Sequence, residues 1–329
     1  MFKTALNSLL TAALLLSTAA SSAEELPGLA GMRRVVFLGD SITYSGQYIE
    51  TVEAYLAVRY PEQRVELLNL GLPSETVSGL SEPGHADGKF PRPDVHERLA
   101  RVLEQTQPDL LVACYGMNCG MYYPPGEERM AKFREGIERL RAAAAKQGAK
   151  VLHVTPPVFD PLPIQARTLP AGREEYKQPY QGYNEVLDQY SAWLVAQRDR
   201  GWQVVDLHTA INRYLAEQRK SNPQFTLAGD GVHMNETGHW LAAQQLLLHL
   251  GAPPDEIEKA TSSQALLASY PRGGETLNLV QQKQRLLKDA WLTKVGHQRP
   301  GMKAGLPLAD AQRAALELES EIRGSVKED

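Results

Sequence analysis

Five short runs of apolar residues recur along the chain, and each is followed by a segment with the periodicity of a helix. The runs are almost continuously apolar instead of alternating with polar residues, which is typical of parallel strands that are covered on both faces. The pattern predicts a five-stranded parallel sheet, with strands at residues 35–39, 65–70, 109–115, 150–155 and 202–207.

Helical periodicity fills the intervals between these strands, at residues 47–60, 94–105, 127–147, 180–200, 209–220 and 236–250. Pro93 stands just before one of these segments and Gly148 follows another, as helix starts and stops favour. Alternating strands and helices imply right-handed crossovers that place helices on both faces of the sheet. We therefore expect a three-layer α/β/α sandwich of the flavodoxin-like type, with its ligand site beyond the carboxyl ends of the strands.

The alternation stops after residues 251–254, Gly-Ala-Pro-Pro, and polar helical segments follow at residues 255–268, 277–294 and 308–322. This divides the chain into an N-terminal segment (1–23), an α/β domain (24–251) and a helical C-terminal extension (252–329). The stretch 283–303 is basic. A basic stretch is usually a solvated face; the alternative is that it lies near the mouth of a site and attracts an anionic substrate.

Residues 1–23 combine one lysine, an apolar core and small residues before position 24, which are the features of a secretory signal peptide. The core is too short for a membrane span, so we expect cleavage after Ala23, a secreted or periplasmic protein and no stable membrane insertion. Without Lys3 the chain keeps 34 Lys and Arg against 39 Asp and Glu. This net negative charge argues against nucleic acid binding. The sequence does not specify an oligomeric state.

Candidate chemistry gathers where the predicted strands end. The first strand runs into Gly39, Asp40 and Ser41, a turn of small and polar residues that would present a side chain. A serine hydroxyl becomes a nucleophile only with a general base in reach. Asp230 and His233 are three residues apart in a loop, so one turn can hold the carboxylate against the imidazole. The sequence therefore predicts a triad of Ser41, His233 and Asp230.

Donors for an oxyanion are expected at the same edge of the sheet. The amide of Ser41 lies at a strand-to-helix turn, where N–H groups and the helix dipole favour negative charge. Gly71 ends the second strand, and its lack of a side chain would let its amide approach a ligand. Asn118 follows the third strand and offers a side-chain amide. We predict these three groups as the oxyanion hole.

These residues resemble the four motif blocks of the SGNH hydrolases, also called the GDSL esterase and lipase family. The matching blocks are residues 39–43, 69–71, 116–118 and 230–233, and the resemblance spans residues 34–250. It implies that Ser41 is the nucleophile, that Asp230 and His233 are its triad partners, and that Gly71 and Asn118 are oxyanion donors. It implies an esterase without a metal or organic cofactor.

Two positions depart from the family's pattern. Cys119 stands where the third block usually has Asp, which leaves open what orients Asn118. Residues 73–76 stand where the second block usually has another glycine, so this loop is expected to differ in shape. The second cysteine, Cys114, lies in an apolar run. A bridge to Cys119 would need the chain to fold back sharply, and we expect two buried thiols.

Other site chemistries could use overlapping residues. Carboxylates and imidazoles could be drawn as the metal site of a metal-dependent phosphoesterase, from Asp206, His208, Asp40, Asp230, His233 and His239. An H-E-x-x-H run is absent, because Ala100 stands where its second histidine would be. We therefore interpret His208 as a helix-start residue. A non-catalytic carbohydrate-binding protein would also fit secretion, but it would not require a triad.

The substrate is the least specified feature. Side chains near the strand exits are expected to line a pocket: Met117, Tyr122, Tyr123 and Phe159. Aromatic faces with polar edges suit a sugar, whereas Met and Phe suit an acyl chain. The long connections 72–92 and 159–179 are expected to form walls or lids. Secretion and polar loops favour a carbohydrate O-acetyl esterase; the alternatives on the same triad are a short-chain ester hydrolase and a lysophospholipase or lipase-type acyl hydrolase.

Overall fold

The five expected strands form one parallel sheet. The computed structural model describes residues 24–327, so the predicted signal peptide lies outside the described residues. The strand order is β2-β1-β3-β4-β5, and every pairing is parallel. The strands are β1 (Arg34–Gly39), β2 (Glu66–Asn69), β3 (Leu110–Cys114), β4 (Lys150–Val154) and β5 (Gln203–Val205). Every residue of the central strand β3 is buried, as its continuous apolar run predicted.

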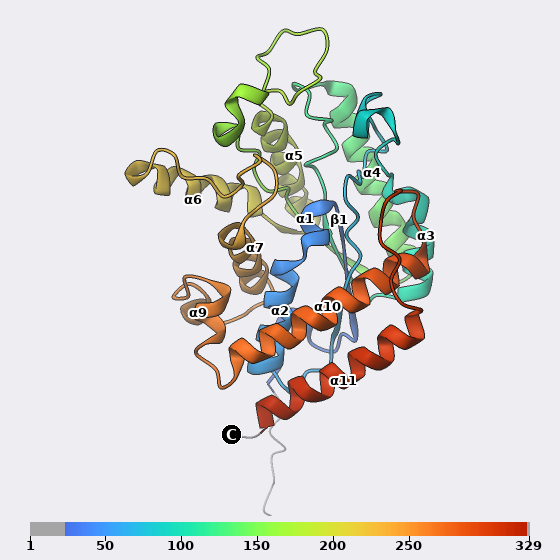
Figure 1. Ribbon diagram of the computed structural model, residues 1–329, viewed down its shortest axis with the longest axis vertical. Helices are drawn as coiled ribbons and strands as arrows, with labels where there is room; N and C mark the ends of the chain where they lie inside the picture. Colours follow the sequence, from blue (N-terminus) through green and yellow to red (C-terminus); the bar gives the residue numbers. More distant parts are fainter. Residues whose placement is uncertain (1–23, 328–329) are drawn as a thin grey trace, which may run out of the picture.

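Helices cover both faces of this sheet (Figure 1). On one face α2 (Gln47–Arg59) packs against α7 (Glu236–His249), which also contacts α6 (Leu207–Ser221). On the other face α3 (Val95–Thr106) packs against α4 (Glu127–Lys146). The ring of Phe133 in α4 stacks on Tyr190 of α5 (Asn184–Ala196) with 4.1 Å between centroids. The expected three-layer α/β/α sandwich is confirmed.

The strand order reverses between β1 and β3, which lie side by side at the centre of the sheet. In their register Gly39 of β1 pairs with Cys114 of β3. The segments that follow these two residues therefore leave the sheet at the same level of the same edge. Ligand sites of open parallel sheets lie at such a reversal point, and Ser41 and Asn118 follow β1 and β3 there.

The C-terminal extension packs on the α/β domain. Helix α10 (Gly273–Val295) crosses α2 and the outer strand β2, and α11 (Leu308–Lys327) lies along α10 (Figure 1). The side-chain amide of Gln284 donates to the carbonyl of Leu67 in β2 at 2.8 Å. Since β2 is an edge strand, α10 covers backbone that could otherwise pair with another chain.

One helix predicted in the extension, 255–268, is two short helices. These are α8 (Pro254–Ile257) and α9 (Ser263–Leu267). The side chain of Ser262 accepts the amide of Ala265 at 3.0 Å and so starts the second helix. A serine that caps a helix has extended backbone, which is why one continuous helix does not form.

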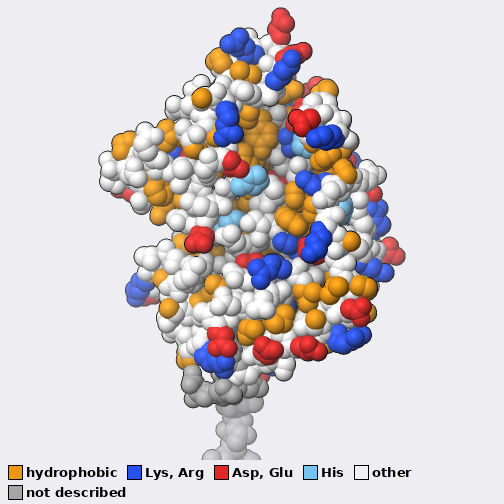
Figure 2. Space-filling view, viewed as in Figure 1, with side chains coloured by type: hydrophobic (Ala, Val, Ile, Leu, Met, Phe, Trp, Pro, Cys, Tyr) orange, Lys and Arg blue, Asp and Glu red, His pale blue; other side chains and the backbone are white. Residues whose placement is uncertain are grey.

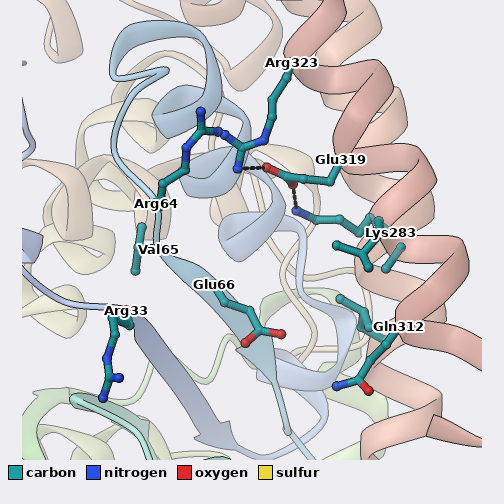
Figure 3. Close-up of a pocket in the computed structure, with 11 residues that line it drawn as sticks. Arg33, Arg64, Val65, Glu66, Lys283, Gln312, Glu319 and Arg323 are labelled. Atoms are coloured by element: carbon teal, nitrogen blue, oxygen red, sulfur yellow. Dashed lines mark hydrogen bonds and ion pairs between the residues drawn. The ribbon is translucent and has the colours of Figure 1, made fainter. Parts of the chain in front are cut away.

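The basic stretch of the extension is divided between two surroundings. Figure 2 shows Lys and Arg side chains gathered near the centre of this face, over α10. Lys283 is largely buried and forms ion pairs with Glu53 of α2 at 2.6 Å and Glu319 of α11 at 2.5 Å. It lines a cavity between β2, α10 and α11 (Figure 3). Lys288 instead reaches the short helix α1 (Ser41–Ser45), where it donates to the Tyr44 carbonyl at 2.7 Å. Only part of the stretch is therefore near Ser41.

Two further expectations concern the thiols and the membrane. Cys114 and Cys119 are both free and buried, as predicted. Burial raises the pKa of the Cys119 thiol to about 11, so this thiol is protonated at neutral pH. In the part of the chain from residue 24 to residue 327, no helix is long and apolar enough to cross a membrane.

Candidate active site

The side chains of Ser41, His233 and Asp230 form one hydrogen-bonded chain. His233 Nε2 lies 2.8 Å from Ser41 Oγ, and His233 Nδ1 lies 2.6 Å from Asp230 Oδ2. A carboxylate can only accept, so Asp230 keeps a proton on Nδ1 and leaves Nε2 to accept the hydroxyl proton of Ser41. The structure thus brings the three predicted residues together in the order that activates a serine.

The loop around Asp230 holds its carboxylate in place. Asp230 Oδ1 accepts the backbone amides of Val232 at 3.0 Å and His233 at 2.8 Å. Partial burial would raise the carboxyl pKa, but the hydrogen bonds from the imidazole and from these two amides lower the pKa of Asp230 below its usual value. Gly231 makes the turn with a φ of 81°, a conformation that favours glycine. Asp230 is therefore the ionised member of the chain.

In the turn that carries Ser41, residues 39, 40 and 41 each have a different structural role. A Cβ on Gly39 would lie 2.2 Å from the hydroxyl of Thr43, so only glycine fits there. Asp40, which is 3% exposed, caps α1 by accepting the amide of Ile42 at 3.0 Å. Burial raises the pKa of Asp40 to about 6. Ser41 is then the first residue of α1, and its own amide has no acceptor within residues 24–327.

Asn118 is oriented from its oxygen side. Arg92 Nη1 donates to Asn118 Oδ1 at 2.9 Å, and the hydroxyl of Tyr122 donates to the same oxygen at 3.2 Å. Two donors on the oxygen fix the amide plane, so the nitrogen is left to donate. One N–H of Asn118 points to the carbonyl of Glu75 at 3.3 Å, and the second is available to a ligand. Arg92 and Tyr122 therefore orient Asn118 in this chain, where Cys119 stands in place of the family's usual Asp.

Arg92 is itself held firmly, although no motif in the sequence marks it. Its Nε and Nη2 atoms both lie 2.7 Å from the carboxylate of Glu82, a two-pronged pairing that fixes the guanidinium plane. The guanidinium also lies 5.4 Å from the ring centre of Tyr122. Glu82 and Arg92 belong to the long connection 72–92, so this loop acts as a wall that supports Asn118.

Gly71 does not supply the predicted oxyanion donor. Its amide donates to Asn69 Oδ1 at 3.0 Å and is therefore already used, so this prediction is wrong. Glycine is required for another reason, because a Cβ would lie 2.3 Å from the Tyr44 amide nitrogen. The sequence pattern detected the glycine but could not separate close packing against α1 from ligand binding.

The same loop offers Ser74 instead. Ser74 has a φ of 68°, an uncommon conformation for a residue other than glycine. Among the amides of residues 71–76, that of Ser74 has no acceptor anywhere in the described part of the chain. It precedes Glu75, whose carbonyl accepts the Asn118 amide. A backbone donor is therefore free beside Asn118, and the missing family glycine at 73–76 was the available signal.

A buried ion pair anchors the loop of residues 71–76. Arg98 and Glu75 are both fully buried and pair through two bonds of 2.6 and 2.7 Å. Arg98 also donates to the carbonyl of Leu70 at 2.7 Å, and the hydroxyl of Tyr115 donates to Glu75 at 2.6 Å. These bonds offset much of the cost of burying the pair, and Nη1 is the one nitrogen of the Arg98 guanidinium without a partner in the described part of the chain. The backbone near Asn118 is thus anchored on both sides.

Two of the four predicted pocket residues line a surface groove. Tyr122 and Tyr123 lie in a cavity of about 390 Å³, walled by residues 82–84 and 175–179. Both long connections therefore form walls, as expected. The ring of Tyr123 lies 5.7 Å from that of Tyr176 in the second wall. The groove is adjacent to Asn118, because Tyr122 contacts both.

Met117 and Phe159 are not pocket residues. They are 1% and 2% exposed and belong to the core. Tyr183 covers both of them, since its hydroxyl donates to the Met117 carbonyl at 2.8 Å and its ring packs edge-on against Phe159 at 5.6 Å. The predicted pocket is corrected accordingly. Burial of a residue after a strand depends on the helix that later packs over it.

The alternative metal site is not assembled. Asp206 caps α6 by accepting the amide of Thr209 at 3.1 Å, and His208 Nε2 lies 2.7 Å from Asp188. His208 is thus a helix-start residue, as predicted. Within residues 24–327, no group of three or more His, Cys, Asp and Glu side chains has the arrangement to hold a metal ion.

Solved structures similar to this chain include a gut microbial diltiazem-metabolizing enzyme, at 20% identity and a TM-score of 0.49, which covers 67% of this chain and 47% of that one. This chain thus spans about half of that enzyme. A catalytic mutant of Axe2, an acetylxylan esterase from Geobacillus stearothermophilus, has 19% identity and a TM-score of 0.49. The match covers 67% of this chain and 94% of the Axe2 chain. The acetyl xylan esterase AlAXEase has 22% identity and a TM-score of 0.47. The match covers 65% of this chain and 97% of the AlAXEase chain.

The sequence comparisons concern the same region as the site. No curated protein sequence matches the chain. The model of the GDSL-like Lipase/Acylhydrolase family matches residues 37–241, which is more than half of the 329 residues. This range contains β1 with Ser41, the Asn118 loop, and the loop with Asp230 and His233. The protein therefore belongs to the GDSL-like Lipase/Acylhydrolase family and is a carboxylic ester hydrolase.

Proposed function

We propose that the protein is a secreted serine esterase that removes acetyl groups from a carbohydrate. The observation that carries the proposal is the chain from Asp230 through His233 to Ser41, with contacts of 2.6 and 2.8 Å. Secretion rests on the signal-peptide features of residues 1–23. This chain supplies the nucleophile and the general base that ester hydrolysis needs.

The reaction proceeds in two halves. His233 Nε2 takes the hydroxyl proton while Ser41 Oγ attacks the ester carbonyl, and Asp230 stabilises the imidazolium that forms. The tetrahedral intermediate collapses as His233 gives its proton to the leaving alcohol, and the acyl group stays on Ser41. Water then attacks the acyl-enzyme with His233 again as base, which releases the carboxylic acid and restores the hydroxyl.

The oxyanion of each intermediate is stabilised by three N–H groups. These are the free amide of Ser41 at the start of α1, the free N–H of Asn118 and the free backbone amide of Ser74. Preorganised donors act without reorganising when charge develops, which is why they accelerate acyl transfer. The anchoring of Asn118 by Arg92 and of the 71–76 loop by Arg98 supplies that preorganisation.

The shape of the site supports a large alcohol and a small acyl group. The side chains of His233 and Asp230 are each 52% exposed, so a polymer can reach them without a lid opening. The groove beside Asn118 carries tyrosine rings, whose faces and hydroxyls suit a sugar. Met117 and Phe159, the apolar side chains expected around an acyl chain, are buried in the core instead. An acetylated carbohydrate fits these features better than a long-chain ester.

The test is release of acetate from an activated acetyl ester by the mature protein and by Ser41→Ala, with EDTA present throughout. We expect activity that survives EDTA and is lost in the variant, with thermal unfolding unchanged. Activity retained in the variant, or lost to EDTA in the wild type, would overturn the serine mechanism. Octanoyl esters provide the substrate test, because turnover comparable to the acetyl ester would overturn the acetyl assignment.

A further inference from the structure

A polar cavity of about 300 Å³ lies beside the end of α1, the helix that begins with Ser41. One of its lining residues, Ser45, is the last residue of α1. It follows Ser41 by one turn of helix, which is about 6 Å along the axis. Another lining residue, Glu236, follows His233 by three positions. The cavity therefore lies between the end of α1, the helix that begins with the nucleophile, and the start of α7, three residues after the base.

The C-terminal extension builds half of this cavity. The α/β domain contributes residues of α1, α2 and α7, and the extension contributes Ser263 and Gln264 of α9 with Leu277, Gln281, Arg285 and Lys288 of α10. Ser263 Oγ lies 2.8 Å from Thr51 Oγ1 of α2, which closes the cavity where the two parts meet. In Figure 1, α9 lies beside α2, and α10 crosses α2 below α1. Without the extension this cavity would have no outer wall.

The lining is mostly polar and contains both donors and acceptors. Leu277 is its one apolar member among the twelve lining residues. Arg285 and Lys288 supply positive charge, and Glu50 and Glu236 supply negative charge. Lys288 is fixed by Tyr44, with its ammonium 2.7 Å from the carbonyl and 4.0 Å from the ring centre. The balance of charge and the mostly polar lining suit hydroxyl groups better than a carboxylate or an acyl chain.

His239 adds a buried polar group to this lining. It is 2% exposed, and its Nδ1 has no hydrogen-bond partner within the described residues. Burial lowers the pKa of His239 to about 4, so the ring is neutral at pH 7. Nδ1 itself is enclosed by protein atoms. His239 is nevertheless a lining residue, so it contributes a neutral ring to the cavity wall.

We propose that this cavity binds a neutral sugar unit on the alcohol side of the scissile ester. The inference rests on the proposed carbohydrate esterase function and gives the C-terminal extension a role in substrate binding. The volume lies at the lower end of small-ligand sites, so the cavity holds a short saccharide. The extension thereby determines which acetylated carbohydrate reaches Ser41.

The experiment measures sugar binding separately from catalysis. Inactive Ser41→Ala protein is titrated by calorimetry with neutral trisaccharides (xylotriose, cellotriose and mannotriose) and with trigalacturonate. We expect at least one neutral trisaccharide to bind, and to bind about ten-fold more weakly when Gln264→Trp fills the cavity or Gln281→Leu removes an amide. Thermal unfolding confirms that each variant is folded.

Matched controls stand on the same helices outside the cavity. Ala265→Trp adds the same bulk at an exposed position of α9, and Gln282→Leu makes the same replacement at an exposed position of α10. Both should leave the dissociation constant within about two-fold. Binding that ignores the cavity variants, binding of no neutral trisaccharide, or a preference for trigalacturonate would overturn the inference.

Failure of the inference is distinguishable from failure of the proposed function. Suppose that Ser41→Ala abolishes acetate release but that changing Gln264 or Gln281 leaves sugar binding unchanged. The serine esterase mechanism would then stand, and the cavity would not be part of the substrate site. Acetate release retained in Ser41→Ala would remove the serine mechanism whatever the titrations give.

Discussion

Arg92 Nη1 donates to Asn118 Oδ1 at 2.9 Å, although 26 residues separate the two in sequence. This contact determines which end of the Asn118 amide can face a substrate oxygen. Glu82 fixes the opposite side of the same guanidinium through two bonds of 2.7 Å. The long connection 72–92 thus contributes to the proposed oxyanion hole in two ways: Arg92 positions Asn118, and Ser74 offers a backbone amide. Arg92 is a positioning residue, and its effect should appear in turnover.

Replacing Arg92 by Met should lower kcat roughly 10- to 100-fold with little change in KM. Loss of a whole oxyanion donor costs about 10²- to 10³-fold, and a donor that is present but free to rotate should cost less. The effect falls on kcat because the bond to the oxyanion forms only in the transition state. Steady-state kinetics on an activated acetyl ester measures it.

A double-mutant cycle separates positioning from general destabilisation. In an Asn118→Ala background the Arg92→Met change should cost less than about three-fold, since no amide remains to be oriented. Arg92→Met with Glu82→Gln removes the charge that the single change leaves unpaired, so it should recover stability without recovering kcat. Full kcat in Arg92→Met, or equal losses in both backgrounds, would show that Arg92 does not orient Asn118.

Replacing Asp230 by Asn should reduce kcat by roughly 10³-fold. Both carboxylate oxygens accept N–H donors, from the imidazole and from the amides of Val232 and His233. An amide has one oxygen, so its NH₂ group must face one of these donors and the imidazole loses its orientation or its tautomer. Because the side chain is half exposed, the unfolding temperature should fall only slightly. A loss smaller than about ten-fold would argue against Asp230 as the orienting residue.

Gly71→Ala should destabilise the fold by about 2–4 kcal/mol, because there is no room for the added carbon. The new Cβ would lie 2.3 Å from the Tyr44 amide nitrogen and 2.7 Å from the Thr43 carbonyl carbon, and both are backbone atoms. Gly84→Ala is the matched control, since nothing lies within 4 Å of its Cβ position and its φ is −89°. Equal unfolding temperatures for the two variants would contradict the packing role of Gly71.

The sequence was sufficient where structure depends on neighbours in the chain. Strands β1 to β5 begin and end within two residues of the apolar runs, because each run alone determines a buried strand. Ser41, Asp230 and His233 could be selected because turn chemistry and a three-residue spacing are local features. Parallel strands then place these local features at one edge.

The sequence was insufficient where a role depends on which distant side chain lies opposite. The sequence pattern assigned the Gly71 amide to ligand binding, but this amide donates to Asn69 Oδ1. Met117 and Phe159 follow strand ends, yet Tyr183 from a later segment covers both. Arg92 carries no local sign of its contact with Asn118. Such assignments need the folded paths of long connections, which periodicity does not specify.

Asp40→Asn should change how stability depends on pH. Burial raises the pKa of Asp40 to about 6, whereas an unfolded aspartate has a pKa near 4. Between these values the folded state binds a proton that the unfolded state has lost, so this group lowers the free energy of unfolding as pH rises from about 4 to about 6. A shift of about two units corresponds to roughly 3 kcal/mol.

Asparagine keeps the cap, because its side-chain oxygen can still accept the Ile42 amide, but it does not ionise in this range. The measurement is the difference in free energy of unfolding between Asp40→Asn and wild type, by denaturant titration at pH 4 and pH 8. We expect this difference to shift in favour of the variant by roughly 3 kcal/mol at pH 8 relative to pH 4. Comparing the two proteins at each pH cancels the other titrating groups. A difference independent of pH would mean that Asp40 ionises in the fold as readily as in the unfolded chain.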